Sequence, residues 1–592
     1  MSGFVFNQEA VCTISNSLYL GSNNGGDWSN TFAKNATINN CYYLNPCGTA
    51  QGTQVTADQL KSGEVAYLLQ GDRTDQFWGQ MLGTEDEPQF TADAAKHIYK
   101  VDFTYNDKVV ASRYANTGKT VTLPTLQDIL GDSYNAHHYY SGFAFADGFT
   151  ASTRVTADKT VAVAATLTDK EYFEIATADD WKAFCDLVNG GQITVDAKLT
   201  KNIDLGGNVW MIGKNGKPYS GTFDGDGHTL SIDWNVISEA APFFYTSGGA
   251  TIKNLHTKGK ITTTSKGASG LIDRVVGKTT ICKCISEVDI TSSYAISACQ
   301  ASGFVSFNKS KKGDLTITDC IVKGTFNATT EKGSTGMGGF VSYNNEVVCT
   351  ISNSLYLGSN NGGIWSYTFA NNATINNCYY LNPCGKAQGT QVTEKQLKNG
   401  YVTKLLQADR TDACYWAQQL GEMPSLFNGN TWAVNRIYYD TVDQRWECNE
   451  LNTSDYLSVG MDFYALRTHF DRNIKANKPY TVTLPCEWSN STDKVYVLSS
   501  VNKAKGMASF SQVENNVNGE FHSFEAYKPY LVVPTNNLSY IGGSIECLVY
   551  AEPDTPVAED VNGVQWRATY EGLTNAEAVA AGAYILQSDG LF

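Results

Sequence analysis

Short runs of alternating apolar and polar residues recur through the middle of the chain. An Ile-x-polar-small phrase occurs at residues 252–255, 281–284, 317–320, 351–354 and 375–378, and a Gly-[Leu/Phe]-[Ile/Val] phrase at 270–272, 303–305 and 339–341. Spacings of about 24 to 36 residues between equivalent positions are typical of a solenoid, whose units bury their apolar sides against each other. Because the runs are β-branched and no helical segment separates them, each unit is predicted to be a turn of parallel β-helix.

Two long stretches of the chain are near copies of each other. Residues 12–74 and 349–411 align without gaps over 63 positions at an offset of 337, and 52 of these positions are identical. Each copy ends in a predicted amphipathic helix that starts with a capping box, Thr56 with Gln59 and Thr393 with Gln396. We expect these helices to cover the open hydrogen-bonding groups at the end of each β-helix. A further helix is predicted at 177–188, with Thr177 as its N-cap.

These patterns predict an all-β chain of right-handed parallel β-helix modules with short capping helices, plus β-grasp-like and β-sandwich domains. Residues 1–91 are interpreted as the last coils and cap of a truncated β-helix that begins in mid-solenoid, and residues 171–427 as a complete β-helix. Residues 92–170 are predicted to form a small β-grasp-like module with strands at 98–105, 118–124 and 155–164. Residues 428–592 are predicted to form a β-sandwich-like domain, with strands at 480–484, 494–498, 530–533 and 545–550.

Composition narrows the class of protein. With 592 residues, 42% hydrophobic and 17% charged, the sequence is that of a folded multidomain protein. A net charge of −15 argues against nucleic acid or an anionic membrane surface as a partner. No run of 18 apolar residues occurs, so no membrane insertion is predicted within this chain. The fifteen cysteines are an odd number spread over a long chain, unlike a small disulfide scaffold.

One cluster of residues could carry chemistry. Asp224, Asp226 and His228 lie within five residues and could bind a structural Ca²⁺ or serve a sugar-cleaving site. The alternative is a glycine-rich turn in which the aspartates accept backbone hydrogen bonds and bend the coil. No other metal or cofactor is predicted. Asp273 and Arg274 are interpreted as a salt bridge in a turn.

Cysteine and aromatic residues recur at equivalent positions. Cys284, Cys320 and Cys378 share the slot of Leu255 and Ser354, and we expect them to point inward as packing groups. Strand alternation predicts that one tyrosine of each Tyr-Tyr pair points outward, and exposed aromatic rings stack well on sugars. The candidate ligand-binding residues are therefore Tyr42, Tyr43, Tyr379, Tyr380, Trp28 and Trp365.

The repeated phrases resemble the GLUG-motif β-helices of secreted and surface proteins of gut and rumen bacteria. The matching text is Phe-Asp-Gly-Asp-Gly-His-Thr-Leu at 223–230, together with the two repeated phrases. Residues 98–165 are similar to internalin-type B-repeats in their strand, Gly-Lys-Thr-Val-Thr-Leu-Pro, strand order, with Gly142-Phe143 in place of the usual Gly-Trp. The resemblance implies an exported protein of the envelope or extracellular space.

Two functions are compatible with these sequence features. The first is a secreted or cell-surface scaffold or adhesin that binds a polysaccharide or a host or partner surface protein along a β-helix face. The alternative is a polysaccharide lyase or glycoside hydrolase that uses this face as a cleft. A row of carboxylates across the coils would favour the enzyme. Rows of aromatic, Asn or Thr residues without acids would favour binding.

Overall fold

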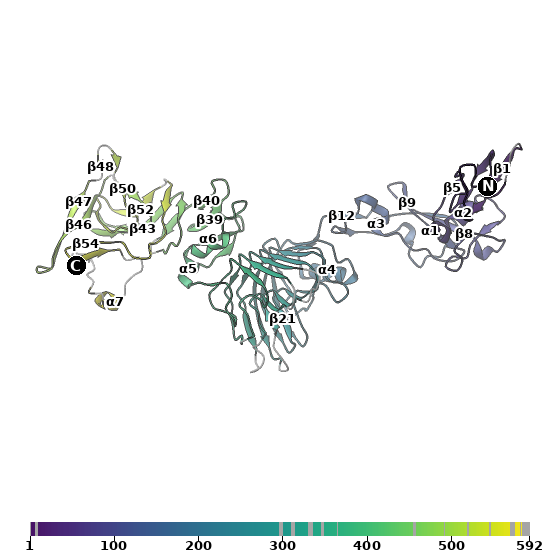
Figure 1. Ribbon diagram of the computed structural model, residues 1–592. Helices are drawn as coiled ribbons and strands as arrows, with labels where there is room; N and C mark the ends of the chain where they lie inside the picture. Colours follow the sequence, from purple (N-terminus) through teal and green to yellow (C-terminus); the bar gives the residue numbers. More distant parts are fainter. Residues whose placement is uncertain are drawn as a thin grey trace. The chain divides into compact units, whose positions relative to one another are not determined.

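The computed structural model describes residues 2–5, 10–294, 300–308, 314–328, 336–344, 348–363, 365–453, 457–490, 492–514, 516–517, 520–521, 523–543, 546–568, 575–580 and 582. The chain is strand-rich, with 42% strand, 11% helix and many parallel sheets, consistent with the predicted all-β class. It divides into two compact units, Met1–Glu171 and Tyr172–Phe592 (Figure 1). This division lies one residue from the predicted limit between 170 and 171.

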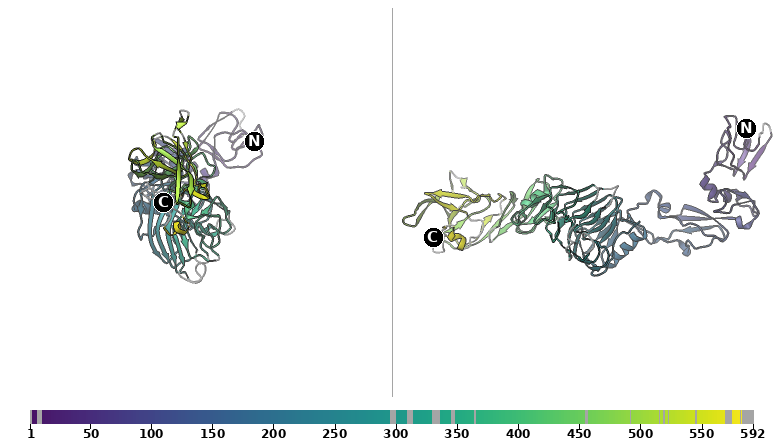
Figure 2. Two further views of the ribbon diagram at one scale, coloured as in Figure 1. Left: turned by 90° about the vertical axis from the view of Figure 1, so that its left-hand side faces the viewer. Right: turned by 60° about the horizontal axis from the view of Figure 1, so that its bottom comes forward.

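The second unit contains a stack of parallel strands, seen side by side in Figure 2. We call each pass of the chain through this stack a coil. The eight-stranded sheet contains, in order, β13 (Phe173–Ile175), β14 (Ala197–Leu199), β16 (Thr222–Asp224), β19 (Ala250–Lys253), β23 (Thr279–Cys282), β27 (Leu315–Thr318), β31 (Cys349–Ser352) and β34 (Thr374–Asn376). The four-stranded sheet contains β18 (Phe243–Thr246), β22 (Ile272–Val275), β26 (Val305–Asn308) and β30 (Val341–Asn344).

A ten-stranded parallel sheet forms another side of the stack. Its strands are β15 (Ile203–Asp204), β17 (Thr229–Val236), β20 (His256–Thr263), β24 (Ile285–Ser292), β28 (Ile321–Val322), β29 (Thr325–Ala328), β32 (Leu355–Tyr356), β33 (Ser359–Asn360), β35 (Tyr379–Tyr380) and β36 (Thr390–Gln391). The short strands β21 (Gly267–Ser269) and β25 (Gln300–Ser302) pair with each other. The register places the repeated isoleucines in line, with Ile252 opposite Ile281 and Ile317 opposite Ile351. The repeated phrases therefore mark equivalent positions in successive coils.

Five successive coils turn at a residue in the left-handed backbone region, directly after β19, β23, β27, β31 and β34. We call these the corner residues: Asn254, Lys283, Asp319, Asn353 and Asn377, with φ between 48° and 52°. Asn and Asp tolerate this conformation better than other non-glycine residues, which explains why the third position of the phrase is polar. The residue after each corner points inward. Leu255, Cys284, Cys320, Ser354 and Cys378 are all buried, as predicted.

A pair of short helices follows the last strand of each copy. These caps are α1 (Ala57–Lys61) with α2 (Glu64–Gln70), and α5 (Glu394–Lys398) with α6 (Tyr401–Gln407). Both predicted capping boxes are present, and the predicted N-cap Thr177 accepts a hydrogen bond at the start of α4 (Ala178–Gly190). No helix of the described residues combines the length and apolar character needed to span a bilayer.

The second cap packs on the outer face of the ten-stranded sheet. Ile321, Leu355 and Tyr379 lie opposite one another along this face. They form one buried cluster with Leu397, Val402, Leu406 and Trp416 from the cap and the strand after it. In the first unit, β2 (Leu18–Tyr19), β4 (Tyr42–Tyr43) and β5 (Thr53–Gln54) form a parallel sheet that meets the first cap in the same way. The caps thus cover an apolar strip as well as the last strand.

The corner residues also hold the second cap. Both Nη atoms of Arg410 donate to the Asp319 carboxylate at 2.8 Å, and the indole N–H of Trp416 donates to the same group at 2.8 Å. Asn377 Nδ2 donates to the Leu405 carbonyl at 2.7 Å, and the Lys283 ammonium lies 4.9 Å from the centre of the Tyr415 ring. Corner side chains therefore bond the carbonyl end of α6 to successive coils.

The same order of elements follows each cap. A hairpin comes first, β6 (Trp78–Gly79) with β7 (Gln89–Phe90), or β37 (Trp416–Gln419) with β38 (Ser425–Leu426). An antiparallel pair comes next, β8 (Ile98–Tyr105) with β9 (Lys108–Asn116), or β39 (Arg436–Asp440) with β40 (Arg445–Cys448). Because β37 pairs with β39, the boundary predicted between 427 and 428 divides one antiparallel sheet.

The strands predicted for residues 92–170 are correct only in part. β8 has the predicted bounds, and β11 (Lys159–Ala162) lies inside the third predicted strand. The strand predicted at 118–124 is wrong, because this segment contributes only an isolated bridge at Lys119. The second strand is β9, and it returns from β8 through Asn106 and Asp107, both with positive φ. Two such residues favour a tight hairpin turn. The segment also contains β10 (Tyr139–Ser141), β12 (Thr168–Lys170) and α3 (Leu126–Leu130).

The C-terminal part of the second unit is built from antiparallel sheets around one apolar core. One sheet has the order β38-β37-β39-β40-β42-β53, with β42 (Phe463–Ala465) parallel to β40 and β53 (Cys547–Val549) at its edge. A second has the order β44-β51-β46-β47, with β44 (Tyr480–Val482), β51 (Tyr530–Val533), β46 (Lys494–Asn502) and β47 (Met507–Val513). A third contains β41 (Leu451–Thr453), β43 (Thr468–Ile474) and β52 (Leu538–Gly543). All four predicted strands appear here: β51 has the predicted bounds, the other three have at least one shifted end, and residue 545 lies outside the described residues.

Several two-stranded sheets and short helices lie outside the larger sheets. The two-stranded sheets are β1 (Cys12–Ser15) with β3 (Ala36–Asn39), β45 (Trp488–Ser489) with β50 (Ser523–Phe524), β48 (Asn516–Val517) with β49 (Glu520–Phe521), and β54 (Ala558–Val561) with β55 (Val564–Arg567). The remaining helices are α7 (Asn575–Ala580) and the 3₁₀ turns Ala94–Lys96, Gly131–Ser133 and Ala146–Gly148.

The Asp319 contacts predict a stability effect. The variant Asp319→Asn keeps a residue that tolerates positive φ but leaves the Arg410 guanidinium without its charged partner. We expect a loss of about 3 kcal/mol in the free energy of unfolding, as is usual when one partner of a buried ion pair is removed. The matched control is Glu394→Gln, which removes an exposed pair with Lys398 and should change nothing measurable. Urea unfolding of both variants tests this, and equal stability of the two would contradict it.

Candidate functional site

The Asp224–His228 segment is a hydrogen-bonded turn between β16 and β17. Asp224 Oδ1 accepts hydrogen bonds from the Asp226 N–H and from Asn254 Nδ2, both at 2.9 Å. Lys253 Nζ lies 3.2 Å from the other Asp224 oxygen, and Lys198 Nζ lies 3.0 Å from Asp226 Oδ2. Both carboxylates thus bond to neighbouring coils, as the structural interpretation of this phrase expects.

Electrostatics agree with this structural role. Partial burial raises the pKa of Asp224, but the hydrogen bonds from Asn254 and the Asp226 N–H, with the Lys253 charge, outweigh it and leave the pKa below its usual value. His228 Nδ1 lies 3.4 Å from Asn202 Oδ1. Across the described residues, no group of three or more His, Cys, Asp or Glu side chains could hold a metal ion. The carboxylates of this turn form ion pairs and hydrogen bonds with neighbouring coils.

The tyrosines predicted to bind ligands are not exposed. Tyr42, Tyr43, Tyr379 and Tyr380 are all buried, at 5–8% exposure, so the expectation that one tyrosine of each pair is accessible is wrong. Alternation holds, because Tyr379 follows the outer row of Leu355 whereas Tyr380 lies opposite Tyr356, which is fully buried. The outer tyrosine is buried because the cap helices pack on it.

The two tryptophans are exposed, Trp28 at 89% and Trp365 at 62%. Their surroundings differ, because the Lys386 ammonium lies 5.8 Å from the centre of the Trp365 ring and 5.2 Å from that of Tyr367. At the positions equivalent to Lys386 and Tyr367, the first copy has Thr49 and Asn30. Trp365 therefore belongs to a small cationic and aromatic group that the first copy does not share.

The buried cysteines are packing groups. Burial raises the pKa of the Cys320 thiol far above its usual value, and neighbouring Cys284 raises it further. All the described cysteines are free thiols. A thiol held protonated in an apolar interior is neither nucleophile nor metal ligand at neutral pH. We conclude that the buried cysteines serve as small side chains that fill the interior of the stack.

A row of threonines crosses the outer face of the eight-stranded sheet. In β19, β23, β27 and β31, burial alternates so that the isoleucines point inward and the threonines outward. Register pairs these outward threonines strand by strand. The threonine row consists of Thr222, Thr251, Thr280, Thr316, Thr350 and Thr374. The sequence analysis did not single out this row, although from Thr251 to Thr374 each threonine directly precedes the isoleucine of a repeated phrase and could have been found from that repeat.

A second outward row runs beside the threonine row. From β14 to β34 it reads Lys198, Asp224, Lys253, Cys282, Thr318, Ser352 and Asn376. Asp224 lies between two lysines in this row, and on β13 Glu174 lies opposite Lys198. Over the last three strands both rows carry only hydroxyl and amide groups. The eight-stranded sheet therefore carries charged side chains over its first strands and an uncharged polar face over β27, β31 and β34.

An arginine–aromatic column lies on the four-stranded sheet. It consists of Tyr245, Arg274, Phe307 and Tyr343, which are register partners on successive strands. The Arg274 guanidinium carbon lies 4.8 Å from the centre of the Phe307 ring and 5.8 Å from that of Tyr245. Of the three rings only that of Tyr343 is exposed, so the column offers one accessible ring.

Asp273 and Arg274 lie on strand β22, so their predicted placement in a turn is wrong. Arg274 Nη2 donates to Glu239 Oε2 at 2.7 Å, and its Nε donates to Asp273 Oδ2 at 3.1 Å. The second oxygen of Asp273 is buried without a hydrogen-bond partner. Burial raises the pKa of Asp273 to about 7, although the Arg274 charge opposes this.

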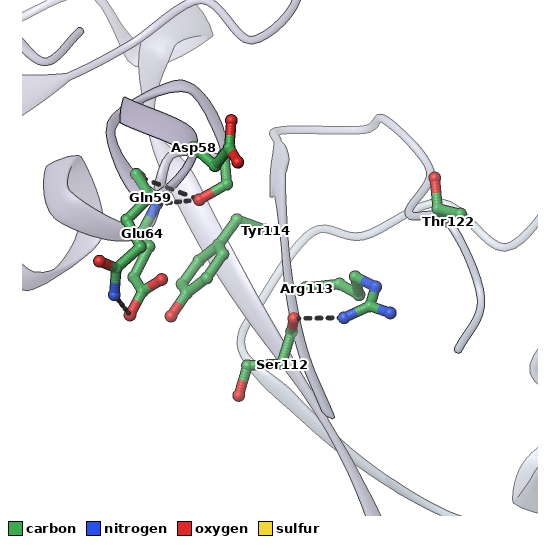
Figure 3. Close-up of a pocket in the computed structure, with 8 residues that line it drawn as sticks. Asp58, Gln59, Glu64, Ser112, Arg113, Tyr114 and Thr122 are labelled. Carbon is green, nitrogen blue, oxygen red and sulfur yellow. Dashed lines mark hydrogen bonds between the residues drawn. The ribbon is translucent and has the colours of Figure 1, made fainter. Parts of the chain in front are cut away.

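The first unit contains a polar hollow of about 400 Å³ beside the first cap (Figure 3). The cap helices contribute one wall and β9 contributes another, and the side chain of Tyr114 on β9 points between the two walls. Its lining residues are Asp58, Gln59, Ser62, Glu64, Ser112, Arg113, Tyr114 and Thr122. Burial raises the pKa of Tyr114, and the charge of Glu64 raises it further, so the phenol stays neutral and can act as a hydrogen-bond donor. Sequence reasoning did not find this hollow, because its two walls are about 50 residues apart.

The raised pKa of Asp273 predicts a pH dependence of stability. The unfolded chain releases this proton near pH 4, whereas the folded protein holds it up to about pH 7. Between these values the folded state binds more protons, so the contribution of Asp273 to stability falls as pH rises from 4 to 7. The variant Asp273→Asn should remove this loss, and its stability relative to the unmodified protein should rise by up to about 4 kcal/mol over that range. Urea unfolding at pH 4 and pH 8 measures it, and the same difference at both pH values would contradict the assignment.

Comparisons with known proteins add little to this geometry. No protein-family model matches the chain, and no curated protein matches it. A solved structure described as "a putative immunoglobulin A1 protease from Bacteroides ovatus" aligns with 15% sequence identity and a TM-score of 0.32. The alignment covers 44% of this chain and 93% of that one. A TM-score this low supports no inference about fold or activity.

Proposed function

We propose that this chain is a secreted or cell-surface scaffold, an adhesin, that binds a polysaccharide or a host or partner surface protein along an outer face of its stacked sheets. In this proposal the stack is a right-handed parallel β-helix of the GLUG-motif kind, residues 92–170 are a B-repeat-like β-grasp module, and the C-terminal part is a β-sandwich. The sequence resemblance supports these finer assignments and the location outside the cell. The threonine row is the observation that carries the binding function.

The outer face of the eight-stranded sheet has the properties of an extended binding surface. Parallel strands lie about 4.8 Å apart, so the threonine row repeats hydroxyl groups at that interval along a rigid sheet. Each hydroxyl both donates and accepts hydrogen bonds, and its partner row adds Thr318, Ser352 and Asn376. A polymer with regularly spaced polar groups can contact many of these at once. Individually weak contacts then add to useful affinity because the surface is already ordered.

The distribution of acids favours binding over catalysis. A glycoside hydrolase needs two carboxyl groups facing each other across the substrate, and a lyase needs a base beside clustered acids. On this face Asp224 is bonded to Asn254 and Lys253, and Asp226 is bonded to Lys198. These carboxylates form ion pairs between neighbouring coils, which supports a structural role for them in this proposal. The polysaccharide-degrading alternative is therefore kept as an outcome of the test.

Binding and cleavage can be separated in one set of experiments. The purified chain is applied to a glycan array and incubated in parallel with pectin, alginate, xylan and β-glucans, following reducing ends and unsaturated uronides. We expect binding without product release. The double variant Thr316→Glu with Thr350→Glu should weaken binding by at least about tenfold, because two charges would lie in the middle of the uncharged face.

The control for this experiment is Thr262→Glu, which places a charge on an exposed position of β20 in the ten-stranded sheet. It should leave binding unchanged. Unchanged binding by the double variant would show that this face is not the binding surface. Metal-dependent release of products would overturn the scaffold proposal in favour of the enzyme.

A further inference from the structure

The two copies of the duplicated module differ mainly at their caps. Eleven of the 63 aligned positions differ, and six of these lie between residues 57 and 67. Asp58 in the first copy corresponds to Lys395 in the second, and Glu64 corresponds to Tyr401. The coils before the caps are nearly unchanged. Each cap has therefore diverged on the surface that meets the next part of the chain.

In the second copy this cap surface is occupied. Lys395 Nζ lies 3.0 Å from Glu552 Oε1, and Ser458 Oγ donates to the other oxygen of Glu552 at 2.9 Å. The Gly460 N–H donates to the Asn399 carbonyl at 2.7 Å. Residues 457–462 then lead into β42, which pairs with β40 as a parallel strand. An extended segment thus passes the cap and continues as a strand along the edge of β40.

In the first copy no strand of the described residues occupies the equivalent place, and Arg113 Nη2 lies 3.1 Å from Asp128 Oδ2 of α3. Ile98 and Ile437 each approach the glycine between the two cap helices, Gly63 and Gly400, which makes β8 equivalent to β39. The antiparallel register then makes β9 equivalent to β40, with Arg113 at the position of Arg445. In the first unit the sheet has the order β11-β8-β9, so within the described residues no strand pairs with the outer edge of β9. The hollow in Figure 3 lies between this strand and the cap.

The charge of the open surface is reversed relative to the occupied one. Where Lys395 meets the acidic Glu552, the first copy presents Asp58, with Glu64 on the next helix. Arg445 lies 4.2 Å from the ring centre of Tyr464, a residue of β42, and its counterpart Arg113 lines the hollow. The first copy thus keeps the arginine that contacts the added strand in the second copy. Its cap, however, carries negative charge where the cap of the second copy carries the positive charge of Lys395.

We propose that the hollow is a docking site for an extended segment of a partner protein, which adds a parallel strand to β9 and places a Lys or Arg side chain against Asp58 and Glu64. Main-chain hydrogen bonds to a free sheet edge supply affinity in this mode of recognition, and side-chain pockets supply specificity. A second copy of this chain fits poorly, because its Glu552, which contacts the segment 457–462 through Ser458, would bring an acid towards Asp58. The partner segment is therefore basic and comes from another protein.

The proposal is tested with a phage-displayed library of random twelve-residue peptides selected on the full chain. Selected peptides should contain more Lys and Arg than the unselected library. Their affinity should fall by at least about tenfold for Asp58→Lys with Glu64→Lys, because two attractive charges become repulsive. The neutral pair Asp58→Asn with Glu64→Gln keeps side-chain shape, and should reduce affinity by an intermediate amount even if the lysine pair folds poorly.

A matched control and a second readout locate the site. The control variant Asp132→Lys with Glu171→Lys makes the same change of charge at exposed positions of the first unit that do not line the hollow, and should bind the peptides normally. Bound peptide should slow the hydrogen–deuterium exchange of residues 108–116. Failure to enrich any peptide, enrichment without basic residues, unchanged affinity of both pocket variants, or protection confined to other segments would each overturn the proposal.

Discussion

Five coils of the stack depend on a left-handed corner directly after the eight-stranded sheet. Five consecutive coils turn at a residue with φ near 50°, and Asn16 and Asn40 do the same in the first unit. For an L-residue this conformation costs about 1–2 kcal/mol relative to the right-handed one, and Asn or Asp reduces the cost. The corner aligns the isoleucine before it with the isoleucines of neighbouring coils and directs a small side chain inward. Register, interior packing and the outward rows all follow from it.

The corners also determine how the stack ends. Their side chains form a column that bonds α6 through Asp319 and Asn377, while the apolar strip of Ile321, Leu355 and Tyr379 packs under the same helices. The cap covers the outer face of one sheet and leaves the outer face of the eight-stranded sheet open. The cap is also followed directly by the hairpin of the next domain, so it connects the stack to that domain. The two surfaces proposed for binding are the face that the cap leaves open and the edge beside this connection.

Local sequence signals predicted much of this structure. Capping boxes, the inward cysteines and β8 were correct, because each depends on spacing within a few residues. The errors come from long-range packing and one missed turn. Asn106 and Asp107 make the hairpin that creates β9, whereas the Gly-Lys-Thr-Val-Thr-Leu-Pro text at 118–124 has strand composition but no strand partner. The paired tyrosines alternate as expected, yet helices distant in the fold cover the outer one.

The candidate site depends even more on tertiary register. The repeated phrase marks the row from Thr251 to Thr374 in the sequence, but strand pairing is needed to add Thr222, which precedes Phe223, and to show that the row lies on one face. The hollow beside β9 is likewise formed by segments that are separate in sequence. Asp224, Asp226 and His228 lie close together in the sequence and suggested a chemical site. In the structure, Asp224 accepts hydrogen bonds that hold the turn after β16.

The most direct test of the corner is a comparison of Lys283→Asn with Lys283→Val. Both variants remove the lysine charge and its contact with Tyr415, so their difference reports mainly how well each residue tolerates the backbone conformation of the corner. If the corner must adopt positive φ, the asparagine variant should be more stable than the valine variant by about 1–2 kcal/mol in urea unfolding, since a β-branched residue is strained there. Equal stability of the two variants, or a more stable valine variant, would contradict a left-handed corner at this coil.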